Sequence, residues 1–194
     1  MESMIDIVGS AVLAGIVILL VFQLNSSLSN ANFQTTLDVS TQENAIVLGN
    51  IMEYDLRKIG YKVSRNVSAI TYADTNGNIK FKSDINNDGK LDSVQYKVSK
   101  TADKKHLIVT RTVNVSPAIA INFGVDTLKV SYYDSTGASI TFPTPTDSAS
   151  LAKIRSLRVH MFFQNLIKLA DSTYPPAAMY WEKYFTMKNL QARK

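Results

Sequence analysis

The most specific short motif in the chain is one turn in which oxygen-bearing side chains alternate, Asp84-x-Asn86-x-Asp88-Gly89-x-x-Asp92. Oxygen ligands at alternate positions can wrap around a hard cation, and glycine at the sixth position allows the sharp turn. The pattern therefore predicts a structural calcium site. Its ligands would be the side chains of Asp84, Asn86 and Asp88, the carbonyl of Lys90, and Asp92 directly or through water.

The surroundings of this motif separate it from a calcium sensor. The twelfth position holds Gln95 instead of the bidentate glutamate of an EF-hand, and both flanks have the alternation of strands. We therefore expect a cation loop between strands. The competing interpretation is a plain polar hairpin turn, because Asn-Asp-Gly is a strong turn signal. The calcium interpretation is favoured because three carboxylates in one turn would otherwise repel one another.

The remaining reactive side chains do not form a catalytic pattern. Cysteine is absent, and the two histidines, His106 and His160, stand alone in strand-like runs. Glu53 and Asp55 are two residues apart on a predicted helix and so do not face each other, and we expect surface charges that pair with Arg57 or Lys58. Motifs for metal hydrolysis, nucleotide binding or a nucleophilic serine are missing. The sequence therefore predicts that the protein is not an enzyme.

Composition narrows the class further. The chain has 194 residues, 45% of them apolar, and a net charge of +5 with scattered basic residues. Binding to nucleic acid requires a concentrated basic stripe, so we expect no nucleic-acid partner. About 170 residues remain beyond the apolar N-terminal run, which is enough for one domain with its own core.

A β-rich domain is predicted from Tyr61 onwards, because the runs become short and alternate between apolar and polar residues. Turn signals such as Asp74-Thr-Asn-Gly77 separate them. The predicted strands are 68–72, 79–82, 93–99, 105–114, 125–133, 139–142, 153–163 with a bulge near Ser156, and a closing strand at 181–190. We expect surface loops at 143–148 and at 171–176.

A long helix precedes this domain. Ile7 to Leu24 is almost wholly apolar, and about 18 residues at 1.5 Å each give roughly 27 Å, close to the thickness of a bilayer core. Helical spacing returns later, with one apolar stripe and Gly60 as the C-terminal stop. The stripe consists of Ala45, Ile46, Leu48, Ile51, Met52, Leu56 and Ile59.

Together these elements predict an α+β fold, in which a long N-terminal helix packs on an antiparallel β-sheet. Residues 1–24 would form a membrane or filament-core helix, 25–60 its amphipathic continuation, and 61–194 the globular domain. The helix from about residue 3 to 59 would be roughly 85 Å long, so part of it must project. Its weakest section is the Asn- and Ser-rich segment 25–36, where we expect unwinding or a bend.

Three interpretations fit the apolar run. A secretory signal peptide is disfavoured, because no Lys or Arg precedes the run and polar helix-like sequence follows it. A membrane anchor is possible, although Asp6 at its edge is costly unless paired. A helix that leaves the membrane and packs against copies of itself could pair that charge.

The third interpretation is supported by a resemblance. Ser3-Met4-Ile5-Asp6 followed by an apolar helix resembles the start of mature type IV pilins and the pseudopilins of type II secretion. Glu53 to Tyr61 and Lys188-Asn189-Leu190 are also similar to segments of large minor pilins. Three features depart from the family: aspartate replaces glutamate, no basic leader is visible, and no proline lies near position 22. If Met1 is removed, Asp6 falls on the fifth mature position.

The resemblance implies a structural subunit of a helical filament, held in the inner membrane before assembly and extracellular afterwards. The acidic side chain at the fifth mature position of this family neutralises the N-terminal amine of a neighbour, and calcium stabilises the globular domain of some members. Carried over to this chain, the resemblance predicts a homo-oligomer built through one set of residues. These are Glu2, Asp6, Gly9, Ser10, Ala11, Ala14, Gly15, Ile16 and Leu20.

Two alternatives stay open. One lies within the family, a minor pseudopilin at a filament tip or in secretion. The other is a membrane-tethered extracellular binding module, whose sheet or aromatic loop captures a ligand. Its aromatic residues would be Tyr174, Tyr180, Trp181, Tyr184 and Phe185.

Overall fold

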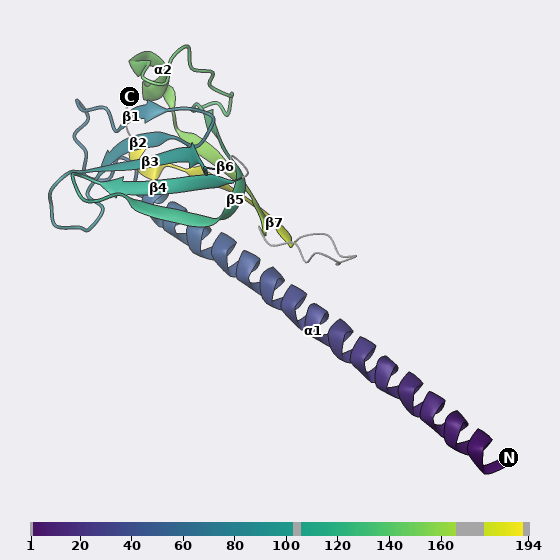
Figure 1. Cartoon of the computed structure of the whole chain (residues 1–194). Coiled ribbons are helices and arrows are strands. Elements are labelled where there is room, and N and C mark those ends of the chain that lie inside the picture. Colours follow the sequence, from purple (N-terminus) through teal and green to yellow (C-terminus); the bar gives the residue numbers. More distant parts are fainter. Residues whose placement is uncertain (1, 103–105, 166–176, 192–194) are drawn as a thin grey trace.

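The structure, a computed structural model, describes residues 2–102, 106–165 and 177–191. Helix α1 (Glu2–Arg57) runs unbroken for 56 residues, and its N-terminal half projects from a β-rich head (Figure 1). The fold is α+β, as the sequence predicts. The expected bend at 25–36 is wrong, because the segment stays helical throughout. There the hydroxyl groups of Thr35 and Thr36 donate to the carbonyls of Ala31 and Asn32 one turn earlier.

Seven strands form one antiparallel sheet in the described part of the chain, and each pairs with the next in sequence. Hairpin-type connections make this meander the simplest arrangement of consecutive strands. The strands are β1 (Ile70–Ala73), β2 (Ile79–Ser83), β3 (Asp92–Lys100), β4 (Leu107–Val113), β5 (Ile119–Tyr133), β6 (Ser156–Gln164) and β7 (Ala178–Thr186).

Several strand boundaries differ from the prediction. Strand β5 begins six residues earlier than expected, and 139–142 forms only an isolated bridge from Ser139 to Tyr133 instead of a strand. The bulge expected near Ser156 lies instead on β5, where pairing with β6 shifts between Val125 and Thr127. Gly124 precedes this shift with a φ of 70°, and a Cβ there would lie 2.8 Å from the Gln164 carbonyl oxygen.

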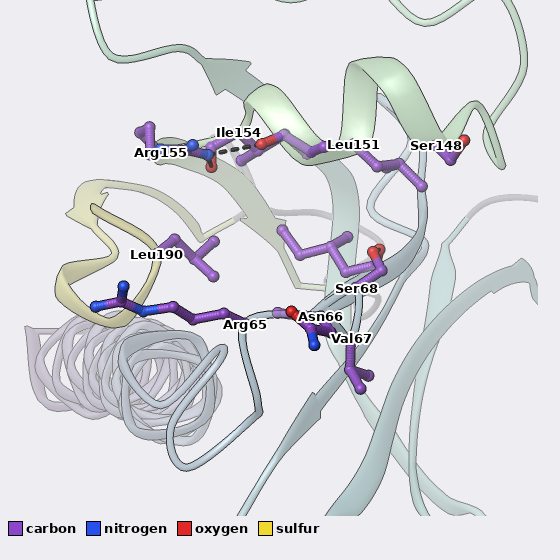
Figure 2. A pocket seen from close by; sticks show the side chains of 12 residues that line it. Arg65, Asn66, Val67, Ser68, Ser148, Leu151, Ile154, Arg155 and Leu190 are labelled. Carbon is purple, nitrogen blue, oxygen red and sulfur yellow. Dashed lines mark hydrogen bonds between the residues drawn. The ribbon is translucent and has the colours of Figure 1, made fainter. Parts of the chain in front are cut away.

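Two short helices were not predicted. Helix α2 (Ser148–Lys153) follows Asp147, whose side chain accepts a hydrogen bond from the Ser150 amide and caps the helix. Helix α3 (Lys188–Gln191) replaces the end of the predicted closing strand. With the segment before β1 they line a cavity of about 370 Å³ (Figure 2). Its lining includes Arg65, Ile70, Leu151, Ile154, Arg155 and Leu190. The predicted loop at 171–176 lies outside the described residues.

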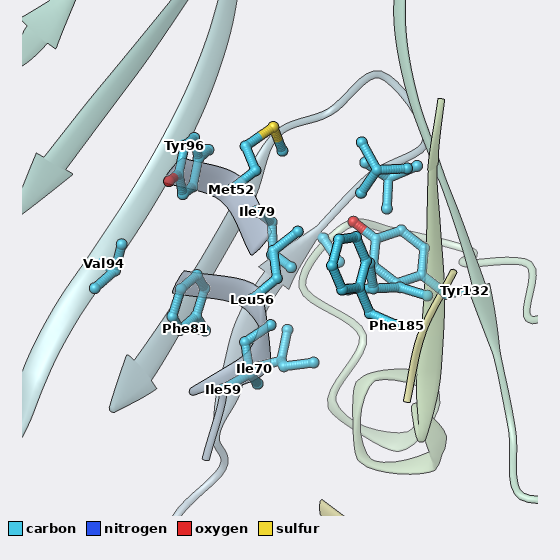
Figure 3. Packing of buried hydrophobic residues seen from close by; sticks show 14 of the residues in the cluster. Met52, Leu56, Ile59, Ile70, Ile79, Phe81, Val94, Tyr96, Tyr132 and Phe185 are labelled. Carbon is cyan, nitrogen blue, oxygen red and sulfur yellow. The ribbon is translucent and has the colours of Figure 1, made fainter. Parts of the chain in front are cut away.

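The hydrophobic core lies between the C-terminal half of α1 and the inner face of the sheet (Figure 3). The predicted helical stripe supplies it, because Ala45, Leu48, Met52, Leu56 and Ile59 are each at most 1% exposed. The predicted members Ile46 and Ile51 differ. Ile46 is 50% exposed, and Ile51 is only partly buried. Each large side chain that is fully buried stabilises the fold by about 2 kcal/mol.

One buried ion pair fastens α1 to the sheet. Asp55 is 1% exposed, and both of its carboxylate oxygens accept hydrogen bonds from Arg111 of β4, at 2.6 and 3.0 Å. The Tyr96 hydroxyl of β3 donates to the same carboxylate at 2.6 Å. Burial, and then the Asp55 charge, raise the pKa of Tyr96 well above its ordinary value, so the phenol keeps its proton. The expectation that Asp55 is a surface charge is therefore wrong.

The neighbouring acidic residue behaves as expected. Glu53 pairs with Arg57 one helical turn later at 2.7 Å, and the Lys183 ammonium of β7 reaches it at 2.5 Å. The hydrogen bond from Lys183 is the main cause that lowers the pKa of Glu53. Glu53 and Asp55 are thus two positions apart on α1 but contact different strands, β7 and β4.

Replacing Asp55 by asparagine should destabilise the head, because Arg111 would keep a charge that is only 20% exposed without its counter-ion. We expect a loss of about 3 kcal/mol in the free energy of unfolding. Denaturant unfolding of the chain in detergent, followed by circular dichroism, measures it. The control is Glu43→Gln on an exposed position of the same helix, which should stay within about 0.5 kcal/mol of the wild type. Equal stability of both variants would contradict this role.

Gly49 lets α1 pack closely against Trp181 of β7, and its replacement by alanine should push the two elements apart. A Cβ at Gly49 would lie 2.8 Å from Cε2 of Trp181, the chain's single tryptophan. Overpacking of this kind costs about 2 kcal/mol and should shift the tryptophan emission. Gly15→Ala is the matched control, because nothing lies within 4 Å of a Cβ there. Unchanged emission and stability in Gly49→Ala would show that the contact is loose.

Candidate assembly surface and cation loop

The projecting half of α1 is an apolar surface that the head does not cover. Its large side chains range from 48% exposed at Ile16 to 71% at Met4. The helix contains an 18-residue window with a mean hydropathy of 2.6, of which none is buried. By length and composition this helix is able to cross a bilayer, so it is compatible with membrane association.

The helix brings most of the predicted assembly residues onto one side. With 3.6 residues per turn, Asp6, Gly9, Ile16 and Leu20 share a face, and Ser10 flanks it. Ala11, Ala14 and Gly15 lie together on another side of the helix, so the set forms one acidic and apolar face and a separate patch of small residues. The side chain of Glu2 lies outside the described structure.

Polar groups in this segment are either satisfied or at its edge. The Ser10 hydroxyl donates to the carbonyl of Ile7 at 2.9 Å, which suits an apolar environment. Asp6 is exposed near the start of the helix. An environment that buries this face must therefore supply a partner for one carboxylate.

The predicted cation loop connects β2 to β3, as expected. Its side chains are held mainly by hydrogen bonds from the loop itself. Asp88 accepts from the Lys90 amide at 2.7 Å and from the Asn86 side chain at 3.0 Å, and the Asn86 oxygen accepts from the Asp88 amide. Asp92 accepts from the Ile85 amide at 3.1 Å and from Asn114 at 2.7 Å. These are the hydrogen bonds of a tight polar turn.

Asp84 differs from the other carboxylates because it is fully buried. Its Oδ2 accepts from the Gly89 amide at 3.0 Å and from the Lys62 ammonium at 2.6 Å. Its Oδ1 is buried and has no hydrogen-bond partner. The hydrogen bond with Lys62 is the main cause that lowers the pKa of Asp84 and raises the pKa of Lys62.

The loop has the types of oxygen atom that bind calcium, but among the described residues these atoms do not converge on one point. Carboxylate and amide oxygens suit calcium. Among the described residues, however, no three Asp, Glu or His side chains gather around one point, and the oxygens of Asp88 and Asp92 are turned to amide donors. The loop as arranged does not fit the ion, and binding would require these side chains to turn. Calcium binding stays a prediction.

Sequence reasoning missed the residues that hold this loop from outside. Lys58 and Lys62 come from the turn after α1, and Asn114 follows β4. The only local signal was their closeness to Gly60, which marks a chain reversal toward the sheet. These contacts join residues 22 to 29 positions apart, so they depend on how the helix and sheet pack.

The predicted aromatic cluster is divided by the alternation of β7. Trp181 and Phe185 point toward α1 and pack with the core, whereas Tyr180 and Tyr184 lie exposed on the other face. His160 of β6 lies next to Tyr180, with ring centres 4.7 Å apart, and His106 is buried at the start of β4. Tyr174 lies outside the described residues. The aromatic residues of β7 thus lie on both faces of the sheet, one face packed on the core and the other exposed.

Comparison with known proteins gives no family: neither the protein-family models nor the curated proteins contain a match to this chain.

Deleting residues 1–24 should leave a soluble monomer, because Leu37 is the first buried apolar residue in the part of the chain that the structure describes. We expect the tryptophan emission and the unfolding midpoint of the head to stay unchanged. Light scattering after gel filtration and thermal unfolding measure both. A truncated chain that still polymerises would show that association resides in the head.

Proposed function

We propose that this protein is a structural subunit of an extracellular type IV pilin-like helical filament. The observation that carries the proposal is the apolar half of α1, exposed along its whole length and projecting from a head with its own core. A surface of this size must be covered by lipid or by other helices. Bundled α1 helices would exchange lipid for one another, with the heads facing outward.

Assembly through this helix gives an open polymer. Each subunit would offer one face of α1 to a neighbour shifted along the axis, and a head-to-tail contact that does not close by rotation repeats without limit. Gly9, Ser10, Ala11, Ala14 and Gly15 allow close approach of helices. Asp6 would neutralise the N-terminal amine of a neighbour inside the bundle, where an unpaired charge is expensive.

The proposed role is structural and not catalytic. The support is the placement of the titratable groups: Asp55 and Arg111 pair to fasten the helix to the sheet. Of the two histidines, His106 precedes β4 and His160 lies on β6, on opposite sides of β5 in the strand order. Before assembly the chain would reside in the cell-envelope membrane, and no nucleic-acid partner is proposed.

Asp6→Asn should reduce filament assembly at least tenfold, since each unneutralised amine in the bundle costs several kcal/mol. The measurement is negative-stain electron microscopy of material sheared from cells, with mass spectrometry to identify its main protein. Glu43→Gln, exposed on the same helix, should assemble normally.

The outcomes separate the candidate functions. Abundant wild-type filaments composed of this chain establish a bulk subunit. Filaments that lack it, with the chain left in the membrane fraction, favour a minor pseudopilin or a tethered binding module. A plain anchor should tolerate Asp6→Asn or gain from it, so unchanged membrane retention without filaments in either form contradicts the filament proposal.

A further inference from the structure

Two ammonium groups from the turn that follows α1 contact oxygens of the 84–92 loop. Lys62 donates to Asp84 Oδ2 at 2.6 Å. Lys58 donates to the Ile85 carbonyl at 2.6 Å and reaches the Asn87 side-chain oxygen at 3.4 Å. A calcium ion in a loop of this type would bind the same kinds of atom, carboxylate and carbonyl oxygens. The positive charge that the loop requires is therefore already present in the chain.

The backbone at Lys62 adopts a left-handed conformation, and from it the side chain reaches Asp84. The φ of Lys62 is 56°, in the left-handed region that costs about 1 kcal/mol or more for a residue with a Cβ. Backbone hydrogen bonds hold the turn in place, from Gly60 to the Lys82 carbonyl and from Asp84 to the Tyr61 carbonyl. Glycine would fit this backbone at lower cost, whereas lysine at this position places its ammonium against Asp84.

Asp84 retains capacity for another cation. Its side chain is 0% exposed, and Oδ1 is buried without a hydrogen-bond partner although Oδ2 has two. An unsatisfied carboxylate oxygen in a buried position is costly unless a charge offsets it. This observation is independent of the acidic pattern in the sequence, and it places one free ligand atom beside the Lys62 ammonium.

We propose that the 84–92 loop is a cation site that the Lys62 ammonium occupies, so that Lys62 and a divalent cation compete for Asp84. The head then folds without metal, and calcium binds with useful affinity only when Lys62 is removed. Loss of Lys62 leaves Asp84 buried and unpaired, and a cation that draws in the Asn86 and Asp88 oxygens would replace the missing charge. This proposal does not depend on filament formation.

The test uses the full chain in detergent and the variant Lys62→Met, which keeps the length of the side chain and removes its charge. The control is Lys80→Met on β2, whose side chain is exposed. Thermal unfolding is followed by circular dichroism in EDTA, in calcium chloride and in magnesium chloride. Calorimetric titration with calcium chloride gives the affinity directly.

We expect the midpoints of the wild type and Lys80→Met to change by less than about 1 °C on addition of calcium, because little ion binds. Lys62→Met should unfold at a lower temperature in EDTA and recover about 5–10 °C when calcium is at a hundred times its dissociation constant. Its affinity for calcium should exceed that of the wild type by about tenfold or more.

Three results would overturn the proposal. Calcium that stabilises the wild type as much as Lys62→Met would show that Lys62 does not compete. A Lys62→Met protein that folds but gains nothing from calcium would show that the loop is only a turn. Failure of Lys62→Met to fold even in calcium, while the double variant K62M/D84N folds, would show that calcium cannot replace the ammonium. The double variant should in any case be insensitive to calcium, because the central ligand is neutral.

Discussion

The docking of residues 45–57 of α1 against the sheet is the constraint on which the rest of the structure depends. This half of the helix supplies the centre of the core, and it carries the carboxylate of Asp55 into that core with Arg111 and Tyr96 around it. A buried carboxylate is stable only with its partners in place, so strands β3 and β4 must sit at one height along the helix. Glu53 pairs with Lys183 of β7 at the more exposed edge of this contact, which adds a weaker link between the helix and the sheet.

Because the helix continues without interruption, the position of the head also determines where the apolar segment begins. The same 56-residue rod is a core element at one end and an uncovered apolar surface at the other. The C-terminal half packs on a protein core, whereas the N-terminal half needs an apolar environment such as lipid or other helices. The polar residues between the two halves stay in the same continuous helix. In the proposed filament, this division would let the heads keep their own stability while the helices exchange one apolar environment for another.

The end of α1 is also where the head is closed. Gly60 and the left-handed backbone of Lys62 reverse the chain toward β2, and Lys58 and Lys62 hold the 84–92 loop by its oxygens. The loop is thereby joined to the helix that anchors the core. A turn rich in carboxylates is stabilised by positive charge. In this protein Lys58 and Lys62, in the turn after α1, supply ammonium groups, and a cation from solution is the alternative source. The pairing of Lys62 with Asp84 therefore lets the loop fold without a metal ion in the proposed arrangement.

The sequence by itself determined the elements whose signals are local. Apolar length predicted the projecting helix, helical spacing predicted Leu48, Met52 and Leu56 as its core face, and alternation with turn residues predicted most strands of an antiparallel sheet. Local signals failed where competing preferences were close. The Asn- and Ser-rich segment 25–36 remained helical, and residues 139–142 had the alternation of a strand but formed only one bridge.

Only the tertiary structure decided which charges are buried and what they contact. Asp55 and Glu53 look alike in sequence, yet one meets Arg111 in the core and the other meets Lys183 at its edge, because 100° of helical rotation per residue sends them to different strands. The Lys62 ammonium that pairs with Asp84 likewise comes from a turn 22 residues away. Spacing along the chain reports the types of ligand atom available, whereas their convergence depends on packing between distant segments.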